Sequence, residues 1–551
     1  NYRNRFTVSE GLNEQHAVNG KYEWKKDSLT SFKITTAGSY KTTSSSSVVN
    51  SEFLNNNKEQ INISDQIRES QTKRVQSDNT FTYKQLFKKK NRQLLTTLRL
   101  GLTDDDNSGM NRTATRFYKS NLPDSLDLVD QMRLFDGAST TLGGKLTYNE
   151  PFGKKWNLVL EYGHNRNHAV SNRGTFNKNP VGKYDDYDSS FSNKFNLNVY
   201  SHSTLTMMRF TDKKFRFNIG SGVSSIRLKL HDVNADTRNS YNFLNLTPQA
   251  NMAYTLKQNG NVSLSYRGTT RQPTIDQLQP IRDNNDPLYE FQGNPELKVS
   301  FNNNVSLNFH QYKVLSGSYI GLNGNYSTTS NAITNYNVLD TLTGKQTYRP
   351  VNVDGVRNFN LYFNRGFAKT PKGLRFGVNI NGNISRNLGF VNGELGVTNS
   401  MRSDFGVSVS YEKEEKANFY IAPHIGYNST KSSFDNALNN NYFIYGAWAN
   451  MFFMLPAKLE LSAEMNMDIY GGIEAFGTSN NIINIKPSLA RKVFKDKTGK
   501  IIFLVNDVLN QNTGFDRNIT TNFISESRYS RLSRYFILRF EWTFTKMPGA
   551  K

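Results

Sequence analysis

Apolar and polar side chains alternate without a break in Leu459-Glu460-Leu461-Ser462-Ala463-Glu464-Met465-Asn466-Met467-Asp468-Ile469. Successive side chains of a β-strand point to opposite faces, so this stretch has one apolar face and one polar face. The polar face carries Glu460, Glu464 and Asp468, which become candidate lumen-facing residues if the strands close into a barrel. The same period of two recurs along the whole chain, whereas the period of helices is nearly absent. The sequence therefore predicts an all-β protein.

Runs of this kind predict 21 strands, and the connections between them alternate between two lengths. Every connection after an odd-numbered strand has 4 to 6 residues, and every connection after an even-numbered strand has 10 or more. This pattern is typical of an antiparallel up-and-down transmembrane β-barrel with short periplasmic turns and long extracellular loops. The predicted strands are Gln15–Trp24, Thr30–Thr43, Arg74–Phe87, Gln93–Thr103, Ser139–Glu150, Trp156–Asn167, Lys194–Phe210, Phe215–Lys229, Phe243–Leu256, Asn261–Arg271, Phe301–Tyr312, Ser318–Ser330, Arg357–Phe367, Leu374–Ser385, Asn399–Tyr411, Ala417–Thr430, Asn441–Met454, Leu459–Ile469, Asn481–Phe494, Ile501–Leu509 and Tyr535–Phe544.

A soluble protein of several β-sandwiches would also show alternation. Its connections would mix short and long lengths irregularly, and its apolar faces would pack inward. Here the hydrophobic fraction is only 36%, while 13% of the residues are aromatic. A barrel explains this composition better, because its apolar faces meet lipid and its polar faces line a wet lumen.

Composition excludes several other classes. The 551 residues include no Cys, so the chain has no disulfide, no thiolate nucleophile and no Cys-based zinc or iron–sulfur site. No run approaches 18 consecutive apolar residues, which argues against a helical membrane span. No basic and then apolar leader opens the chain, so any signal peptide is expected upstream.

The net charge of +22 is compatible with nucleic-acid binding, so the positions of the charges matter. The ten short turns alone hold 20 basic and 6 acidic side chains. They place most of the excess at one rim of the barrel, where Lys side chains can meet lipid phosphates. No basic groove with interleaved aromatic residues emerges, so a nucleic-acid partner is not expected.

A motif follows the tenth predicted strand. It reads Arg271-Gln272-Pro273-Thr274-Ile275-Asp276-Gln277-Leu278 and, further on, Gly293-Asn294-Pro295-Glu296-Leu297-Lys298. The two segments resemble the paired signature of TonB-dependent receptor barrels, here of the Bacteroidota outer-membrane type. They depart from it at Val299-Ser300, where that family usually has Pro-Glu. The segments Asn506–Asn512 and Arg534–Phe536 are similar to the same group's last strand junction. The motif residues are Arg271, Pro273, Leu278, Gly293, Asn294, Pro295, Leu297 and Lys298.

Two interpretations of this motif stay open. Its prolines fix φ and its Gly-Asn-Pro is turn chemistry, while Thr274 could cap a short helix through Leu278. Folding of the extracellular loop is therefore favoured over direct contact with a substrate.

The last predicted strand supplies a second resemblance. An aromatic-rich amphipathic strand at the end of the chain resembles the signal read by the machinery that assembles outer-membrane barrels. Its residues on one face are Phe536, Leu538, Phe540, Trp542 and Phe544.

The strand directions suggest how the chain is divided. Counting back from the last strand places residues 1–14 in an extracellular loop, residues 15–544 in the barrel and residues 545–551 in a periplasmic tail. A bacterial single-chain barrel needs an even strand number, so one more strand is expected upstream, giving 22, the number of the plugged transporters. The plug domain that the resemblance implies is not in these residues.

Other chemistry is weakly indicated. His164 and His168 are four residues apart on a strand, about 13 Å, which is too far for one metal ion. Gly143-Gly144-Lys145 lies inside a strand and lacks the pattern of a phosphate loop. Asp104–Gly109 and Asp185–Asp188 could hold Ca²⁺, but solvated loops are the simpler interpretation. No catalytic residue, metal or cofactor is predicted.

The resemblance implies an outer-membrane barrel that imports a bulky nutrient, captured by extracellular loops and released when a plug is displaced. The expected partners are outer-membrane lipid, an upstream plug domain, a TonB-type energy-coupling protein, and a surface lipoprotein or other outer-membrane subunits. A plugless passive channel or a scaffold subunit is the alternative. An outer-membrane lipase or protease is disfavoured. The substrate class (siderophore, cofactor, glycan or peptide) stays open.

Overall fold

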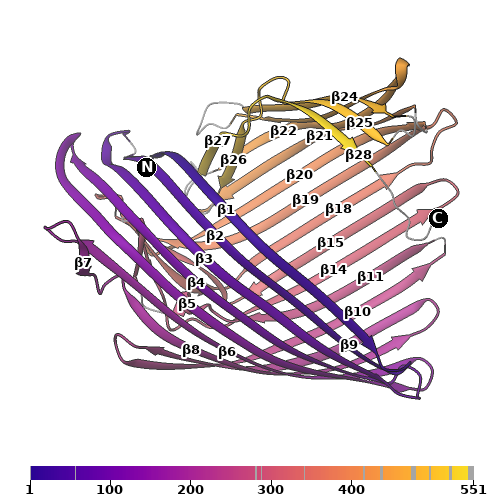
Figure 1. The fold of residues 1–551 in the computed structure, drawn as a ribbon, viewed down its shortest axis with the longest axis horizontal. Helices are drawn as coiled ribbons and strands as arrows, with labels where there is room; N and C mark the ends of the chain where they lie inside the picture. Colours follow the sequence, from indigo (N-terminus) through magenta and orange to yellow (C-terminus); the bar gives the residue numbers. More distant parts are fainter. Residues whose placement is uncertain are drawn as a thin grey trace.

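The computed structural model describes residues 2–543 except 56, 258, 279–281, 287, 341, 414–415, 435–438, 473–479, 495–497 and 520–523. Within them, 21 strands form one continuous antiparallel wall (Figure 1). The wall strands are β1 Tyr2–Lys25, β2 Thr30–Leu54, β3 Gln60–Leu86, β4 Gln93–Lys119, β5 Leu122–Phe152, β6 Trp156–Lys178, β8 Asn193–Thr211, β9 Phe215–Asp232, β10 Thr237–Leu256, β11 Gly260–Arg271, β14 Ser300–Lys313, β15 Ser318–Ser330, β18 Val356–Gly366, β19 Leu374–Val391, β20 Glu394–Lys413, β21 Ala417–Ser432, β22 Asn440–Leu455, β23 Leu459–Tyr470, β24 Asn480–Val493, β25 Gly499–Asn506 and β28 Tyr535–Trp542.

Each wall strand pairs with the next along the chain, which is the up-and-down topology that the sequence predicts. One end of the wall, here called the short-turn end, carries only brief connections such as 26–29, 212–214 and 456–458. The opposite end, here called the long-loop end, carries the remaining small elements. In the described part of the chain, β1 pairs with β2 alone and β28 with β25 alone, so each leaves one edge open.

The 21 predicted strands correspond one to one to the wall strands, but many boundaries at the long-loop end were wrong. β1 begins at Tyr2, so residues 2–14 are strand rather than irregular loop. Strands β1 to β5 have 24 to 31 residues, whereas about 9–11 suffice to cross a bilayer. Their outer parts, such as Ser44–Ser47, are polar on both faces. The apolar alternation therefore stops where lipid stops, while backbone pairing continues as hairpins.

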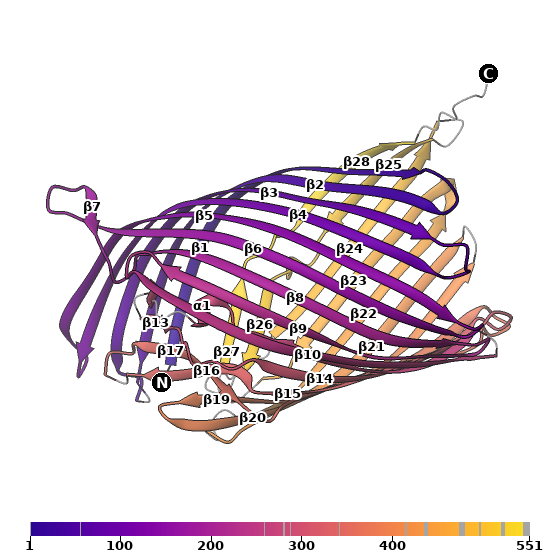
Figure 2. The same cartoon turned by 90° about the horizontal axis from the view of Figure 1, so that it is seen from below.

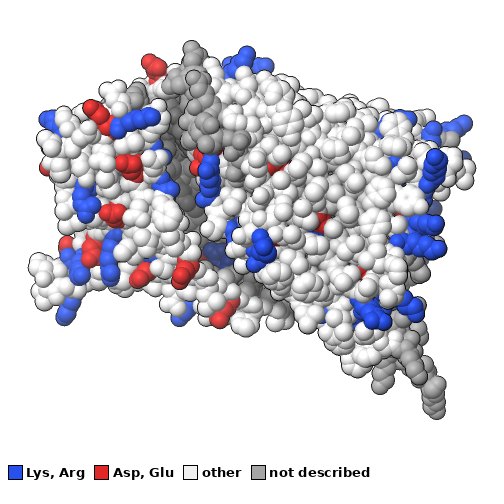
Figure 3. Space-filling view, turned by 90° about the horizontal axis from the view of Figure 1, so that it is seen from above, with Lys and Arg blue, Asp and Glu red and all other residues white. Residues whose placement is uncertain are grey.

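The outward face of the wall is apolar between its two ends. Aromatic rings gather near the short-turn end, where Trp24 stacks on Phe32 at 5.3 Å and Trp156 lies 4.8 Å from Phe210. Figure 3 shows charged side chains at both ends and a broad, mostly uncharged band between them. Such a band with an aromatic girdle is the lipid-facing surface of a transmembrane barrel.

The small elements gather at the long-loop end (Figure 2). A core cluster there joins the inner face of β8 and β9 to the loop after β11, through Leu197, Leu228, Leu230, Leu278 and Leu297. No helix of the described residues is long and apolar enough to cross a membrane. The small elements are β7 Tyr184–Tyr187, α1 Ile275–Leu278, β12 Arg282–Asp286, β13 Tyr289–Gln292, β16 Ala332–Leu339, β17 Gln346–Val353, β26 Gly514–Ile519 and β27 Ile524–Tyr529, and the 3-10 turn Pro456–Lys458 lies at the short-turn end.

Candidate functional site

Two polar rows cross the inner face of β14, β15, β18, β19 and β20. The strand register aligns them side by side, because directly opposed residues on neighbouring strands share a face. The first row, here called the bonded row, is Ser306, Asn325, Asn360, Asn383 and Arg402. The second, here called the amide row, is Asn308, Asn323, Tyr362, Asn381 and Asp404.

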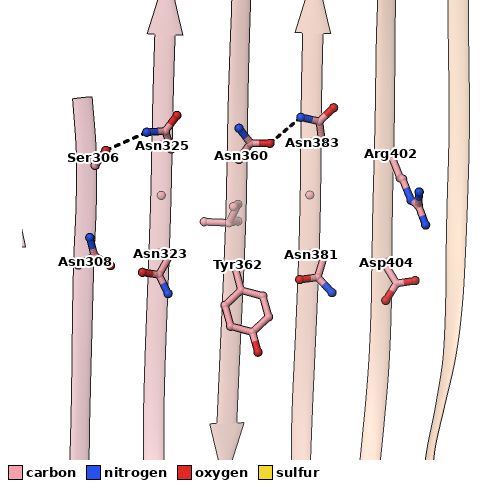
Figure 4. A pocket seen from close by; sticks show the side chains of 13 residues that line it. Ser306, Asn308, Asn323, Asn325, Asn360, Tyr362, Asn381, Asn383, Arg402 and Asp404 are labelled. Carbon is pink, nitrogen blue, oxygen red and sulfur yellow. Dashed lines mark hydrogen bonds between the residues drawn. The ribbon is translucent and has the colours of Figure 1, made fainter. Parts of the chain in front are cut away.

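Hydrogen bonding separates the two rows, as Figure 4 shows. In the bonded row, Asn325 Nδ2 donates to Ser306 Oγ at 2.8 Å, and Asn383 Nδ2 donates to Asn360 Oδ1 at 2.6 Å. In the amide row, the carboxamides of Asn308, Asn323 and Asn381 have no side-chain partner within the described residues and are exposed to the lumen. The amide row therefore offers three free donor and acceptor groups.

Both rows line a cavity of about 420 Å³ on the wall. Its two charged side chains, Arg402 and Asp404, have opposite sign, so the cavity carries no net charge. The polar surface continues onto β21, where His424 Nε2 lies 3.8 Å from Asp404 Oδ2. The His424 ring lies over Gly446 of β22, where even a Cβ atom would come within 2.1 Å of the ring. Gly446 pairs with Asp468 of β23.

Aromatic side chains border this surface. Trp448 faces inward and lies 5.1 Å from the Tyr420 ring, centroid to centroid. Trp24, Trp156 and Trp542 all lie on the outward face, so Trp448 is the one tryptophan of the inner wall. A polar surface bordered by aromatic faces can hydrogen-bond a solute and stack against its apolar faces.

A hairpin crosses the long-loop end above the cavity. It is formed by β16 and β17 and is here called the strap. At its tip, Thr343 O accepts a hydrogen bond of 2.7 Å from Asn62 Nδ2 of β3, and Lys345 Nζ lies 3.7 Å from Asp127 of β5. Gly344 has a φ of +72° and packs so tightly against Phe53 that a Cβ would lie 2.7 Å from the ring. The strap thus joins distant parts of the wall across the mouth.

Acid is expected to loosen the strap tip. Asp340 accepts hydrogen bonds from Thr343 Oγ1 at 2.6 Å and from Leu342 N at 2.9 Å, and these hold the pKa of its carboxyl below its ordinary value. Because the carboxyl has a lower pKa in the folded tip, its ionised form stabilises that tip fully at pH values above the unfolded pKa of about 3.9. As the pH falls from there through the lower, folded-state pKa, this stabilisation is lost. A spin label on Leu342→Cys should become more mobile in that acid range. Asp340→Asn should make the label mobile at every pH; a spectrum unchanged by both acid and this substitution would contradict the prediction.

The motif residues lie at the base of the loop after β11. Leu278 is 1% exposed and Leu297 5% exposed, both in the core cluster, and Pro273 and Gly293 are also buried. Thr274 Oγ1 accepts from Gln277 N at 3.4 Å, which is the predicted cap of the short helix. Arg271, Pro295 and Lys298 are exposed.

Asn294 ties this motif to the strap. Its side chain is buried, Nδ2 donates to Pro350 O at 2.9 Å, and Oδ1 accepts from Glu296 N at 3.1 Å. Lys298 N donates to Asn352 Oδ1 of the strap at 2.8 Å. These contacts support the interpretation that the motif folds the loop; a role in substrate contact stays a hypothesis.

A second hairpin, β26–β27, is anchored by a buried ion pair. Arg517 Nε donates to Glu526 Oε1 at 2.8 Å, Nη1 donates to Gly471 O at 3.1 Å, and the guanidinium lies over the Tyr442 ring at 4.6 Å. The exposed fractions of the Arg517 and Glu526 side chains are 1% and 6%. The pair therefore docks the hairpin against β22 and β23.

Removal of this arginine is expected to release the hairpin. Arg517→Met leaves Glu526 buried without its main partner, at a cost of about 3 kcal/mol. Protease cleavage between residues 507 and 534 should then rise by about a hundredfold, because local opening controls cleavage. The exposed Arg531→Met is the control and should cleave like the parent. Equal cleavage of Arg517→Met and the parent would show that the pair does not anchor the hairpin.

The three predicted lumen carboxylates have different surroundings. Glu460 is buried near the short-turn end and lies 2.6 Å from Lys500 and 3.4 Å from Lys492. Glu464 accepts from Asn466 at 3.3 Å. Asp468 has no ion-pair partner within the described residues and lies in the row of His424. Of the three carboxylates, Asp468 is thus the one in the row of His424, and none of them lines the cavity.

The C-terminal strand has the predicted faces. Phe536, Leu538, Phe540 and Trp542 of β28 are exposed on the outward face, in line with Phe503 of β25. Phe544 and the predicted tail at 545–551 lie outside the described residues. A role of this strand in assembly stays a prediction.

The two possible Ca²⁺ segments lie in different settings. Asp104–Asp106 belong to β4 rather than to a loop, because this strand extends beyond the membrane. Their side chains alternate between the faces, and Asp105 pairs with Arg74 of β3. Asp185 and Asp186 lie in β7, and the described residues contain no group of three side chains suited to hold a metal ion.

The sequence reasoning missed the amide row. A signal was present, because Asn recurs at alternate positions in four neighbouring strands, at Asn302/Asn304, Asn323/Asn325, Asn358/Asn360 and Asn379/Asn381/Asn383. Alternation alone assigns these residues to the polar face and does not distinguish them from its other polar residues.

Comparisons with solved structures find similar chains at low identity. The copper transporter OprC is 10% identical, covers 98% of this chain and 80% of its own, and has a TM-score of 0.47. The ferric-catecholate import receptor Fiu of E. coli K12 is 11% identical, with 98% and 81% covered and a TM-score of 0.45. The siderophore receptor PirA of Pseudomonas aeruginosa is 12% identical, with 82% and 76% covered and a TM-score of 0.38.

No curated protein matches the chain. The model of one protein family, the outer membrane protein beta-barrel family, matches residues 85–542, which include all but the first strands of the wall. The short-turn end is then periplasmic and the long-loop end extracellular. With its antiparallel wall, apolar outer band and polar inner face, the chain belongs to the outer membrane protein beta-barrel family of the bacterial outer membrane.

Proposed function

We propose that this barrel imports a bulky, polar solute without net charge, which enters past the strap and binds along the amide row. The observation that carries the proposal is the row of free carboxamides on Asn308, Asn323 and Asn381, which faces a cavity of about 420 Å³. These amides make no hydrogen bond to another side chain of the described residues, so they can bond to a solute without breaking a hydrogen bond inside the protein.

The charges around the cavity support a solute without net charge. Arg402 and Asp404 balance each other, and His424 adjoins the acid. A strongly anionic solute would meet Asp404 without a surplus of cations, so its binding is disfavoured. This reasoning makes a neutral or zwitterionic solute rich in hydroxyl or amide groups the first candidate.

Energy for import is proposed to come from a TonB-type protein that displaces a plug from the lumen, as the resemblance of the motif implies. The passive channel and the scaffold subunit remain the alternatives. A passive channel would equilibrate its solute without energy, whereas an energised receptor accumulates it.

We also propose that one further strand closes the wall between β1 and β28. The wall has 21 strands of alternating direction, so β1 and β28 run the same way. Direct pairing between them would be parallel, whereas one inserted strand would pair antiparallel with both. Its side chains would alternate between apolar and polar, as on the neighbouring strands.

An uptake experiment tests the function. Deletion of the gene should abolish accumulation of one polar solute from a screened set, and the full-length gene should restore it. An uncoupler of the inner membrane should also stop accumulation. Continued equilibration of the solute after uncoupling would favour the passive channel, and normal uptake of the whole set by the deletion strain would favour the scaffold.

A further inference from the structure

An uncompensated basic surface lies on the outward face of β6, β8, β9 and β10, which lie side by side in Figure 2. Side chains alternate between the two faces of each strand, and Leu197, Leu228 and Leu230, which lie between the basic residues in sequence, are buried in the inner core cluster. The basic residues therefore point outward. This surface, here called the basic patch, consists of Arg166, Lys194, Arg227, Lys229 and Arg238, with His164, His168 and His202 between them. His231 lies on the same face, but its Nε2 is 3.1 Å from Asp236, so it is not counted in the patch.

The five cations have no acidic partner within the described residues. They take part in no ion pair there, and the outward positions between them on the four strands carry no Asp or Glu. The outward cations of β4 differ, because Arg112 lies 3.6 Å from Asp130 and Arg116 lies 3.4 Å from Asp65. The basic patch therefore needs its counterions from outside the chain.

The patch begins where the lipid-facing band ends. On the periplasmic side it is bordered by the exposed apolar or aromatic side chains of Tyr162, Val223 and Leu244. The row Arg166, Tyr200 and Arg227 lies further toward the long-loop end across three strands, with His164, His202 and Ser225 between it and Tyr162 and Val223. This height is the extracellular border of the bilayer, where the head groups of outer-leaflet lipids lie.

The side chains of the patch are arranged to receive a phosphate. The Arg166 guanidinium lies over the Tyr200 ring at 5.6 Å, which orients it without occupying all of its donors. Arg227 donates through Nε to Asn242 at 3.0 Å and keeps its terminal nitrogens free for other acceptors. Two arginines flanking one tyrosine offer the planar forks that phosphate groups accept in pairs.

We propose that the basic patch binds the phosphate groups of a phosphorylated outer-leaflet lipid, of the lipid A type. The acyl chains of this lipid would cover the apolar band below the patch, while its phosphates meet Arg166, Arg227 and Lys229. The site is separate from the lumen and does not depend on the transported solute. It fixes the barrel in an outer leaflet of phosphorylated lipid.

Native mass spectrometry of the purified full-length protein in detergent, with added bisphosphorylated lipid A, tests this proposal. The parent is expected to retain the lipid, and Arg166→Ala/Arg227→Ala/Lys229→Ala should weaken retention by about a hundredfold, as about 1 kcal/mol per cation implies. The matched control Arg112→Ala/Arg116→Ala removes outward cations that have acidic partners and should bind like the parent. Unchanged heat-modified migration on gels would show that each variant is folded.

Four outcomes would overturn the proposal. Equal retention of lipid A by the triple variant and the parent would remove the patch as its site. Equal retention of dephosphorylated lipid A would show that the phosphates do not matter. Displacement of lipid A by millimolar inorganic phosphate would assign the patch to the free anion rather than to a lipid. Capture of an acidic protein by the patch, with lipid A unbound, would assign it to a protein partner.

Discussion

Cross-linking the strap tip to the opposite wall is expected to stop uptake. Asp127→Cys with Lys345→Cys introduces two thiols where the native side chains lie 3.7 Å apart, and the native chain has no Cys. A bismaleimide should join them and hold the strap across the mouth, so that uptake of the transported solute falls by about tenfold or more. Radiolabelled solute in intact cells measures the effect.

The single variants are the controls for the cross-link. Asp127→Cys and Lys345→Cys alone react with the reagent but cannot join the strap to β5, so each should import the solute at its untreated rate. Full uptake by the cross-linked double variant would show that the solute does not pass the strap, and the proposed route would be wrong.

Removal of the amide row is expected to weaken binding of the solute strongly. Asn308→Ala/Asn323→Ala/Asn381→Ala deletes the three free carboxamides, each able to form hydrogen bonds of about 0.5–1.5 kcal/mol net. The affinity for the solute should fall by about ten- to a thousandfold, depending on how many amides the solute engages. Quenching of Trp448 fluorescence provides a binding measurement, because this tryptophan alone lies on the inner wall.

Two controls make this experiment specific. Thr82→Ala/Thr97→Ala removes inward polar groups on β3 and β4, and it should leave the affinity unchanged. Trp448→Phe should abolish the fluorescence response without abolishing uptake. An unaltered affinity in the triple Asn variant would exclude the amide row as the binding surface.

The sequence predicts the order of the wall strands well, but it predicts the ends of these strands at the long-loop end poorly. The reason is that the apolar alternation depends on contact with lipid. Lipid requires an apolar outward face, so alternation marks each strand between the short-turn end and the lipid border. Beyond that border water meets both faces, and the Ser44–Ser47 segment shows no alternation although it is paired on both sides. The same loss of signal turned residues 2–14 of β1 into a predicted loop.

The inward-folded loops could not be predicted in this way. The contact between Asn62 and Thr343 joins residues 281 positions apart, and no local pattern encodes such a pairing. The motif is an intermediate case. Its Pro, Gly and Asn residues predicted a folded loop, but the burial of Leu278 and Leu297 against β8 and β9 depends on the whole barrel.

The most direct test of the transport route is labelling of a thiol on the amide row. Asn381→Cys should react with a membrane-impermeant maleimide, and saturating solute should slow this reaction by about tenfold by occupying the row. Ile380→Cys, the lipid-facing neighbour, should not react, with or without solute. Labelling of Asn381→Cys that saturating solute leaves unchanged, in cells that still accumulate the solute, would contradict the proposed route.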